Sequence, residues 1–132
     1  MIEQSKEESY LPRQVGIDAY GNGGFHFADM SHKGSLLCLP NGMHAWQVKS
    51  AAEISKQTLK LIFEQADNID ILLVGLGEDI AFFDAQIRAE LRQHSVIVEA
   101  ISTSAAISTY NVLVAEKRSV AAALIAVERS KK

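Results

Sequence analysis

The sequence predicts a three-layer α/β domain, in which an N-terminal antiparallel β-meander leads into a βαβαβ mixed sheet with helices. Two observations predict it. In the first third, short alternating apolar segments are separated by glycine-rich turns. In the remainder, apolar runs alternate with stretches of helical periodicity, which indicates right-handed βαβ crossovers or a return strand on the same sheet. The length of 132 residues suits one domain, which we assign to residues 13–127, between a flexible leader (1–12) and a charged tail (128–132).

The meander follows from the spacing of the apolar residues. Residues 14–20 alternate as a half-buried strand does, and a glycine-rich turn follows at 21–24. Phe25 and Phe27 then share one face of a short strand. The next segments, in chain order, are predicted to be a turn at 29–34, an apolar strand at 35–39, a stop at Pro40-Asn41-Gly42 and an extended piece at 43–48.

Helical periodicity starts after the meander. Ser55 is a predicted N-cap for a helix to about residue 66, Asp84 for a second helix to about residue 94, and Thr103 or Ser104 for a third. Their inward positions repeat at three or four residues: Leu59-Ile62-Phe63, Ile87-Leu91 and Ala106-Tyr110-Leu113. The predicted strands between and after them are 69–74, 96–101 and 119–127.

Composition narrows the class of protein. The chain is 48% hydrophobic and carries a net charge of -3, which argues against a nucleic-acid partner. Its apolar runs are shorter than the ~20 residues of a transmembrane helix, and residues 1–9 lack the features of a signal peptide. The single cysteine, Cys38, lies in an apolar run, is predicted to be buried, and suits a reducing compartment. We therefore expect a cytoplasmic protein.

Signatures of catalysis and metal binding are missing from the sequence. It has no GxSxG elbow and no Cys/His signature of a nucleophilic enzyme. The four histidines have no zinc-ligand spacing: His26, His32, His44 and His94. Glu78 and Asp79 are adjacent carboxylates, but they follow a turn and are expected to be solvated. The sequence thus predicts no enzymatic activity, metal or cofactor.

A candidate ligand site follows from two strand-to-helix junctions, Gly75-Leu76-Gly77 and Ser102-Thr103-Ser104. If the strands that precede them are parallel neighbours, both junctions open at the sheet edge where ligands bind in α/β proteins, and hydroxyls and free amides there suit a small anion. The candidate residues are Gly75, Gly77, Thr103 and Ser104, with Tyr110 and Asn111 beside them. The structural alternatives are a tight turn, ordinary N-capping and, for Asn111, a hydrogen bond to a loop. Trp46 is either a core residue or the anchor of a protein interface.

Three blocks, in order, carry a resemblance to a known family: Gly34-Ser35-Leu36-Leu37-Cys38-Leu39-Pro40 with Trp46 downstream, Leu73-Val74-Gly75-Leu76-Gly77, and Thr109-Tyr110-Asn111-Val112-Leu113 before Val120-Ala121-Ala122-Ala123-Leu124-Ile125. Over residues 13–127 the chain resembles the small α/β domain family of unknown function first described from a methanogen, which includes a mitochondrial complex I assembly factor and an adipogenesis-associated protein. The resemblance implies a three-layer α/β fold and no established enzymatic activity or catalytic residue. That family often has a cysteine or arginine just before Thr-Tyr-Asn, where this chain has Ile107 and Ser108.

The leading hypothesis is a non-enzymatic accessory domain that contacts another protein, with a role in assembly of a membrane-bound respiratory complex implied by the resemblance. The alternative hypothesis is a small-anion or metabolite module at residues 75–77 and 102–104. The apolar content also leaves weak self-association open, although no sequence feature fixes its order.

Overall fold

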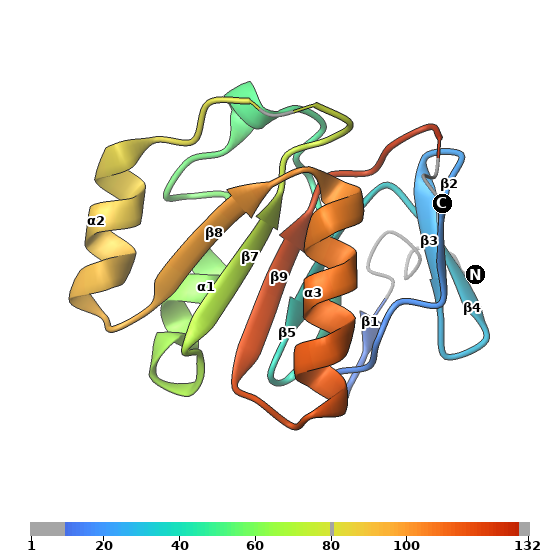
Figure 1. Cartoon of the computed structure of the whole chain (residues 1–132), viewed down its shortest axis with the longest axis horizontal. Coiled ribbons are helices and arrows are strands. Elements are labelled where there is room, and N and C mark those ends of the chain that lie inside the picture. Colours follow the sequence, from blue (N-terminus) through green and yellow to red (C-terminus); the bar gives the residue numbers. More distant parts are fainter. Residues whose placement is uncertain (1–9, 80, 130–132) are drawn as a thin grey trace.

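The computed structural model describes residues 10–79 and 81–129. The elements, in chain order, are β1 (Tyr10–Leu11), β2 (Ala19–Gly21), β3 (Gly24–Phe27), β4 (Met30–Lys33), β5 (Ser35–Leu39), β6 (Gly42–Trp46), the 3₁₀ turn η2 (Ala51–Glu53), α1 (Lys60–Glu64), the 3₁₀ turn η3 (Ala66–Asn68), β7 (Ile71–Gly75), α2 (Ala85–Gln93), β8 (Ile97–Ile101), α3 (Thr103–Ala115) and β9 (Val120–Leu124). They form two sheets (Figure 1).

The larger sheet has six strands in the order β1-β6-β5-β9-β7-β8. Strands β7, β8 and β9 are parallel, with β7 between the other two, and β5 joins them to the antiparallel half through β9. Strands β2, β3 and β4 form a separate antiparallel sheet beside it (Figure 1). The predicted α/β class, with a meander leading into a mixed sheet, is confirmed, and the meander is divided between the two sheets.

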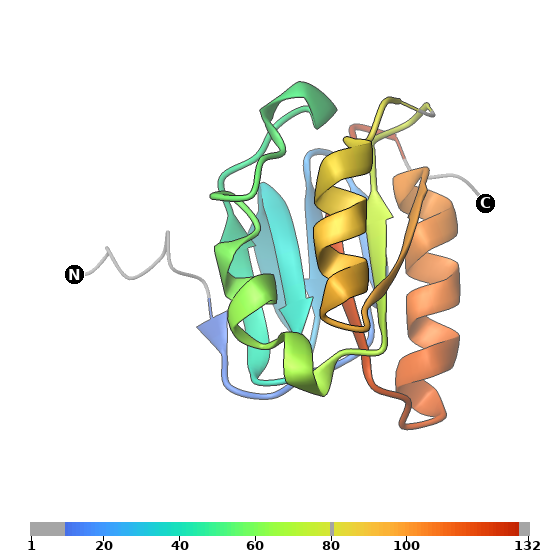
Figure 2. The same ribbon diagram turned by 90° about the vertical axis from the view of Figure 1, so that its left-hand side faces the viewer.

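Helices cover both faces of the larger sheet. Figure 2 shows α3 on one side and α1 and α2 on the other. Since β7 leads to α2 and β8 leads to α3, the loops that leave these neighbouring strands turn toward opposite faces. In α/β proteins, ligand-binding crevices arise where the loops of neighbouring strands diverge in this way.

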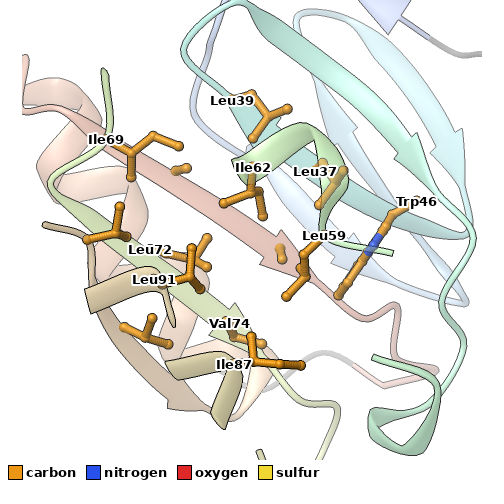
Figure 3. Close-up of a cluster of buried hydrophobic side chains, with 14 of the residues drawn as sticks. Leu37, Leu39, Trp46, Leu59, Ile62, Ile69, Leu72, Val74, Ile87 and Leu91 are labelled. Atoms are coloured by element: carbon orange, nitrogen blue, oxygen red, sulfur yellow. The ribbon is translucent and has the colours of Figure 1, made fainter. Parts of the chain in front are cut away.

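The core has one cluster on each face of this sheet. The first lies under α1 and α2 and includes the fully buried Leu59, Ile62 and Leu91 (Figure 3). The second lies under α3 and joins Tyr110 to Phe25 and Phe27 of the small sheet. Residues Ala121, Ala122 and Ala123 of β9 are fully buried, and their short side chains let layers pack closely over the middle of the sheet.

The predicted meander is partly wrong in its boundaries. Of the expected strand at 14–20, only residues 19 and 20 lie in a strand (β2), because Val15 and Ile17 bond to side chains of α3 instead of to a neighbouring strand. The expected turn at 29–34 is mostly strand β4. The chain reverses earlier, at Ala28 and Asp29, whose φ angles of 50° and 62° close a two-residue hairpin.

Two predicted helix starts also differ. The first helix covers only Lys60–Glu64, although Ser55 Oγ accepts a hydrogen bond from the Thr58 amide (3.2 Å) in the turn before it. The third is capped by Ser102, whose Oγ accepts from the Ala105 amide. Asp84 caps α2 as predicted.

The structure describes only part of the predicted leader and of the predicted tail. Residues 1–9 of the leader and 130–132 of the tail lie outside the described residues. Tyr10 and Leu11, expected in the flexible leader, instead pair with His44 and Met43 of β6.

Candidate functional site

Four of the predicted site residues meet at one edge of the larger sheet, where β7 and β8 end. Thr103 is fully buried there; its Oγ1 donates to the Ile125 carbonyl (2.8 Å) and accepts from the Gly77 amide (3.0 Å). Its own amide donates to the Gly77 carbonyl (2.8 Å). Thr103 therefore joins the ends of β7 and β9 to the start of α3. Its hydroxyl proton is donated to a carbonyl group of the protein itself.

The two glycines at this edge serve different purposes. A Cβ on Gly75 would lie 2.8 Å from Thr103 Cα and 2.9 Å from its Oγ1, so glycine lets α3 begin directly against β7. Gly77 has a φ of 108°, which favours glycine, and faces open space. Ser104 is half-buried, with its Oγ 3.5 Å from Ser102 Oγ. This geometry is that of the two structural alternatives to a ligand site: a tight turn at residues 75–77 and ordinary N-capping at the start of α3.

Tyr110 and Asn111 lie elsewhere, two turns along α3. The Asn111 side chain forms a two-point contact with the backbone of Ile17, donating to its carbonyl (2.9 Å) and accepting from its amide (2.8 Å). The Tyr110 hydroxyl donates to the Val15 carbonyl (2.6 Å). The structure thus separates these residues from the sheet edge, and Asn111 makes the hydrogen bond to a loop that was its structural alternative.

Cys38 is buried beneath this contact. Burial raises the pKa of its thiol to about 12, and burial is also the main cause that raises the pKa of the neighbouring Tyr110 hydroxyl. A thiol held in the protonated form is a poor nucleophile. Within residues 10–79 and 81–129, no three His, Cys, Asp or Glu side chains are grouped so as to hold a metal ion.

Trp46 lies in the core beneath α1. It is 6% exposed, its ring lies beside Leu59, and its indole N–H donates to the Thr58 carbonyl (2.8 Å) (Figure 3). This geometry is that of a core residue, so Trp46 offers a partner very little surface as an interface anchor.

The prominent exposed aromatic residue is instead Phe82, which is 78% exposed. It lines a pocket of about 390 Å³ with its neighbours in the chain and with η2: Ala51, Ala52, Ile54, Ala81, Phe83 and Asp84. Both segments lie at the sheet edge where β7 and β8 end (Figure 1). We name this surface the Phe82 pocket. Phe83, the next residue in the chain, packs against the core, and the Arg88 guanidinium lies 5.5 Å from the centroid of its ring.

Sequence reasoning did not identify the Phe82 pocket. The available signal was the Phe82-Phe83 pair immediately before the N-cap Asp84, because two adjacent aromatic residues in a loop do not both reach one core. The other wall, at Ala51–Glu53, carries no sequence signal of its own.

None of the helices in the described parts of the chain is both long and apolar enough to cross a membrane.

Comparisons with known proteins place this fold among small domains of unknown function. The family model described as Protein of unknown function (DUF498/DUF598) matches residues 17–125. The chain is 35% identical over 109 residues to NADH dehydrogenase [ubiquinone] 1 alpha subcomplex assembly factor 3 of Xenopus tropicalis, a match that spans 83% of this chain and 60% of that protein. It is also 35% identical over 120 residues to an uncharacterized protein of Rhodobacter capsulatus, covering 86% of this chain and 91% of that protein.

A solved structure has the same fold over most of both chains. The crystal structure of a Bartonella henselae protein, described as an outer membrane protein, has a TM-score of 0.85 and 41% sequence identity. The match covers 89% of this chain and 98% of that one.

Proposed function

The chain belongs to the family of proteins of unknown function DUF498/DUF598, and on that premise we propose that it is a non-enzymatic accessory domain that binds another protein during assembly of a membrane-bound respiratory complex. The observation that carries the proposal is the exposure of Phe82 beside an apolar pocket. Aromatic side chains that fill or flank a pocket are frequent energetic centres of protein interfaces.

The free energy available at this surface is appreciable. Fully burying a phenylalanine side chain is worth about 1.5–3 kcal/mol, and Phe82 has most of its surface still exposed. The pocket beside it can receive an apolar side chain of the partner, so the two surfaces interlock rather than merely touch. A partner that buries Phe82 and fills the pocket would therefore gain binding free energy from a small contact area.

The relatives support an assembly role in particular. Proteins named as NADH dehydrogenase assembly factors align with most of this chain. The chain spans 60% of the length of the Xenopus tropicalis protein, so the identity of the partner does not transfer with the name.

The interior supports a role without catalysis. The Cys38 thiol is buried and protonated, and Thr103 is engaged in bonds within the protein. A free buried thiol also suits the reducing cytoplasm, which is the location that we propose.

The test is restoration of the respiratory complex in a strain of the source organism that lacks the gene. Phe82→Ser is compared with Val112→Ser, which alters another exposed apolar residue, on α3 (56% exposed). We expect wild type and Val112→Ser to restore assembled NADH dehydrogenase on native gels, and to recover its subunits in affinity capture, while folded Phe82→Ser does neither. Full restoration by Phe82→Ser would remove the Phe82 pocket as the binding surface. A deletion strain with normal NADH dehydrogenase would reject the assembly role.

The alternative function, small-anion binding at residues 75–77 and 102–104, has less support. An anion there would compete with the bonds of Thr103 to Gly77 and Ile125. Ser104 is the candidate that keeps a half-exposed polar side chain at the helix start. A phosphate titration that shifts the Ser104 amide resonance would favour this alternative.

A further inference from the structure

A second concave surface lies where the small sheet meets the larger one. Two hollows, of about 500 and 240 Å³, share the lining residues Lys33, Gly34, Ser35 and Lys49 and so adjoin along one concave surface. We name it the sheet-junction groove. Its larger end is closed by Asn22, Gly23, Ala126 and Glu128.

The walls of the groove are fixed by hydrogen bonds between segments far apart in the sequence. The turn after β2 is tied to the chain that follows β9 by bonds from the Asn22 amide to the Glu128 carbonyl (2.8 Å) and from the Gly23 amide to the Val127 carbonyl (2.9 Å). Figure 1 shows this C-terminal segment reaching the small sheet. The Gly34 amide donates to the Gly23 carbonyl (2.8 Å), which fixes the third segment. The groove is therefore formed before any ligand arrives.

The floor of the groove is open at Gly34. Its φ of 93° is unfavourable for residues with side chains, and a Cβ placed there would meet no atom within 4 Å. The neighbouring Ser35 is buried, because its Oγ accepts a hydrogen bond from the Ala126 amide (3.0 Å). The free space beside Gly34 therefore belongs to the groove and does not extend into the core.

The charges along the groove are arranged unevenly. Lys33 and Lys49 are exposed, and neither has an ion-pair partner in the described part of the chain, whereas Lys56 pairs with Glu90 at 3.0 Å. The carboxylate of Glu128 lies at the other end, close to Gly23. Two cations therefore line one groove in a protein with a net charge of -3.

We propose that the sheet-junction groove binds a free small molecule that carries a phosphate group and a hydrogen-bond donor. The phosphate lies between the ammonium groups of Lys33 and Lys49, since lysine acts on phosphate as a point charge. The donor, an ammonium or hydroxyl group, faces the Glu128 carboxylate. The larger hollow has the volume usual for small-molecule sites. This site is separate in residues and in chemistry from the Phe82 pocket.

The probes are phosphoethanolamine, which carries both groups, and inorganic phosphate and ethanolamine, which carry one each. Titration into ¹⁵N-labelled protein at constant pH and ionic strength is followed by amide resonances. We expect phosphoethanolamine to shift residues 22–23, 33–35 and 47–49 and to bind more tightly than either fragment. Absence of saturable shifts at these residues up to about 20 mM would overturn the proposal.

Substitutions separate a local site from a general effect of charge. Lys33→Gln and Lys49→Gln should each weaken phosphoethanolamine binding about fivefold, whereas Lys60→Gln, an equal loss of charge on exposed α1, should leave it unchanged. Glu128→Gln should weaken phosphoethanolamine but strengthen inorganic phosphate, because it replaces a charged acceptor by a weaker neutral one and removes a charge that repels phosphate. Equal weakening by Lys60→Gln, or the same sign of effect of Glu128→Gln on both probes, would refute the site.

Discussion

Replacing Thr103 with valine tests whether this residue is a structural clamp at the sheet edge. Valine has nearly the same shape as threonine, so packing is preserved while both hydrogen bonds of Oγ1 are lost. The Ile125 carbonyl is left buried without this donor, and the half-exposed Gly77 amide recovers part of its loss from water. Leaving a buried polar group unsatisfied costs about 1–3 kcal/mol.

From these bonds we expect Thr103→Val to lower the free energy of unfolding by about 2–3 kcal/mol. For a domain of this size the corresponding fall in Tm is about 7–10 °C. The measurement is urea unfolding followed by circular dichroism at 25 °C, with a thermal scan alongside.

Two further variants serve as controls. Thr103→Ser keeps both bonds and removes one buried methyl group, which should cost about 1 kcal/mol. Thr109→Val makes the same chemical change at an exposed position of α3 and should stay within about 0.5 kcal/mol of wild type. If Thr103→Val is as stable as Thr109→Val, the hydrogen bonds of Thr103 do not stabilise the fold, and Thr103 is again a candidate ligand-binding residue.

The remaining predictions concern the contacts of α3 and the buried thiol. Gly75→Ala should destabilise the protein by about 3 kcal/mol, because the new methyl group meets backbone of α3 at 2.8 Å; a near-neutral effect in urea unfolding would contradict this close approach. Asn111→Leu should cost about 2 kcal/mol and accelerate hydrogen exchange of the Ile17 amide, since that amide loses its acceptor; unchanged exchange would refute the two-point contact. Burial raises the pKa of the Cys38 thiol from 9.0 to about 12. Between pH 9 and 12 the thiol therefore ionises in the unfolded state but not in the folded state, and rising pH lowers the free energy of unfolding over this range. Wild type should therefore lose about 1.4 kcal/mol more than Cys38→Ala between pH 8 and pH 10, and parallel pH profiles of the two proteins would exclude the shift.

Much of the fold is determined by local sequence pattern. The run at 69–74, mostly apolar and followed by glycine, predicts strand β7, and the periodic Ile87 and Leu91 predict the inward face of α2. Both signals are local, because burial on two faces or on one stripe sets which residues are apolar. The strand-helix-strand order predicts a right-handed crossover or a return strand on the same sheet, and the structure shows β7 and β8 paired in parallel.

The division of the meander into two sheets is not available from local pattern. Strand β5 continues into the larger sheet because it pairs with β9, nearly ninety residues later in the chain. The segment at 15–17 has the alternation of a strand but no strand beside it, since Asn111 and Tyr110 supply its hydrogen bonds. Pairing across such distances depends on the final arrangement of layers.

The candidate site shows the same limit. The sequence by itself indicated that Gly75, Gly77, Thr103 and Ser104 meet at one edge on the condition that the two preceding strands are parallel neighbours, because parallel strands carry their carboxyl ends to the same side. Only the tertiary structure decided what those groups do there: the Thr103 hydroxyl bonds to the Ile125 carbonyl and the Gly77 amide, so its hydrogen bonds are satisfied within the protein. Exposure is likewise a tertiary property. Trp46 became buried and Phe82 became exposed because burial depends on which elements pack over a side chain, and one-dimensional pattern does not contain that information.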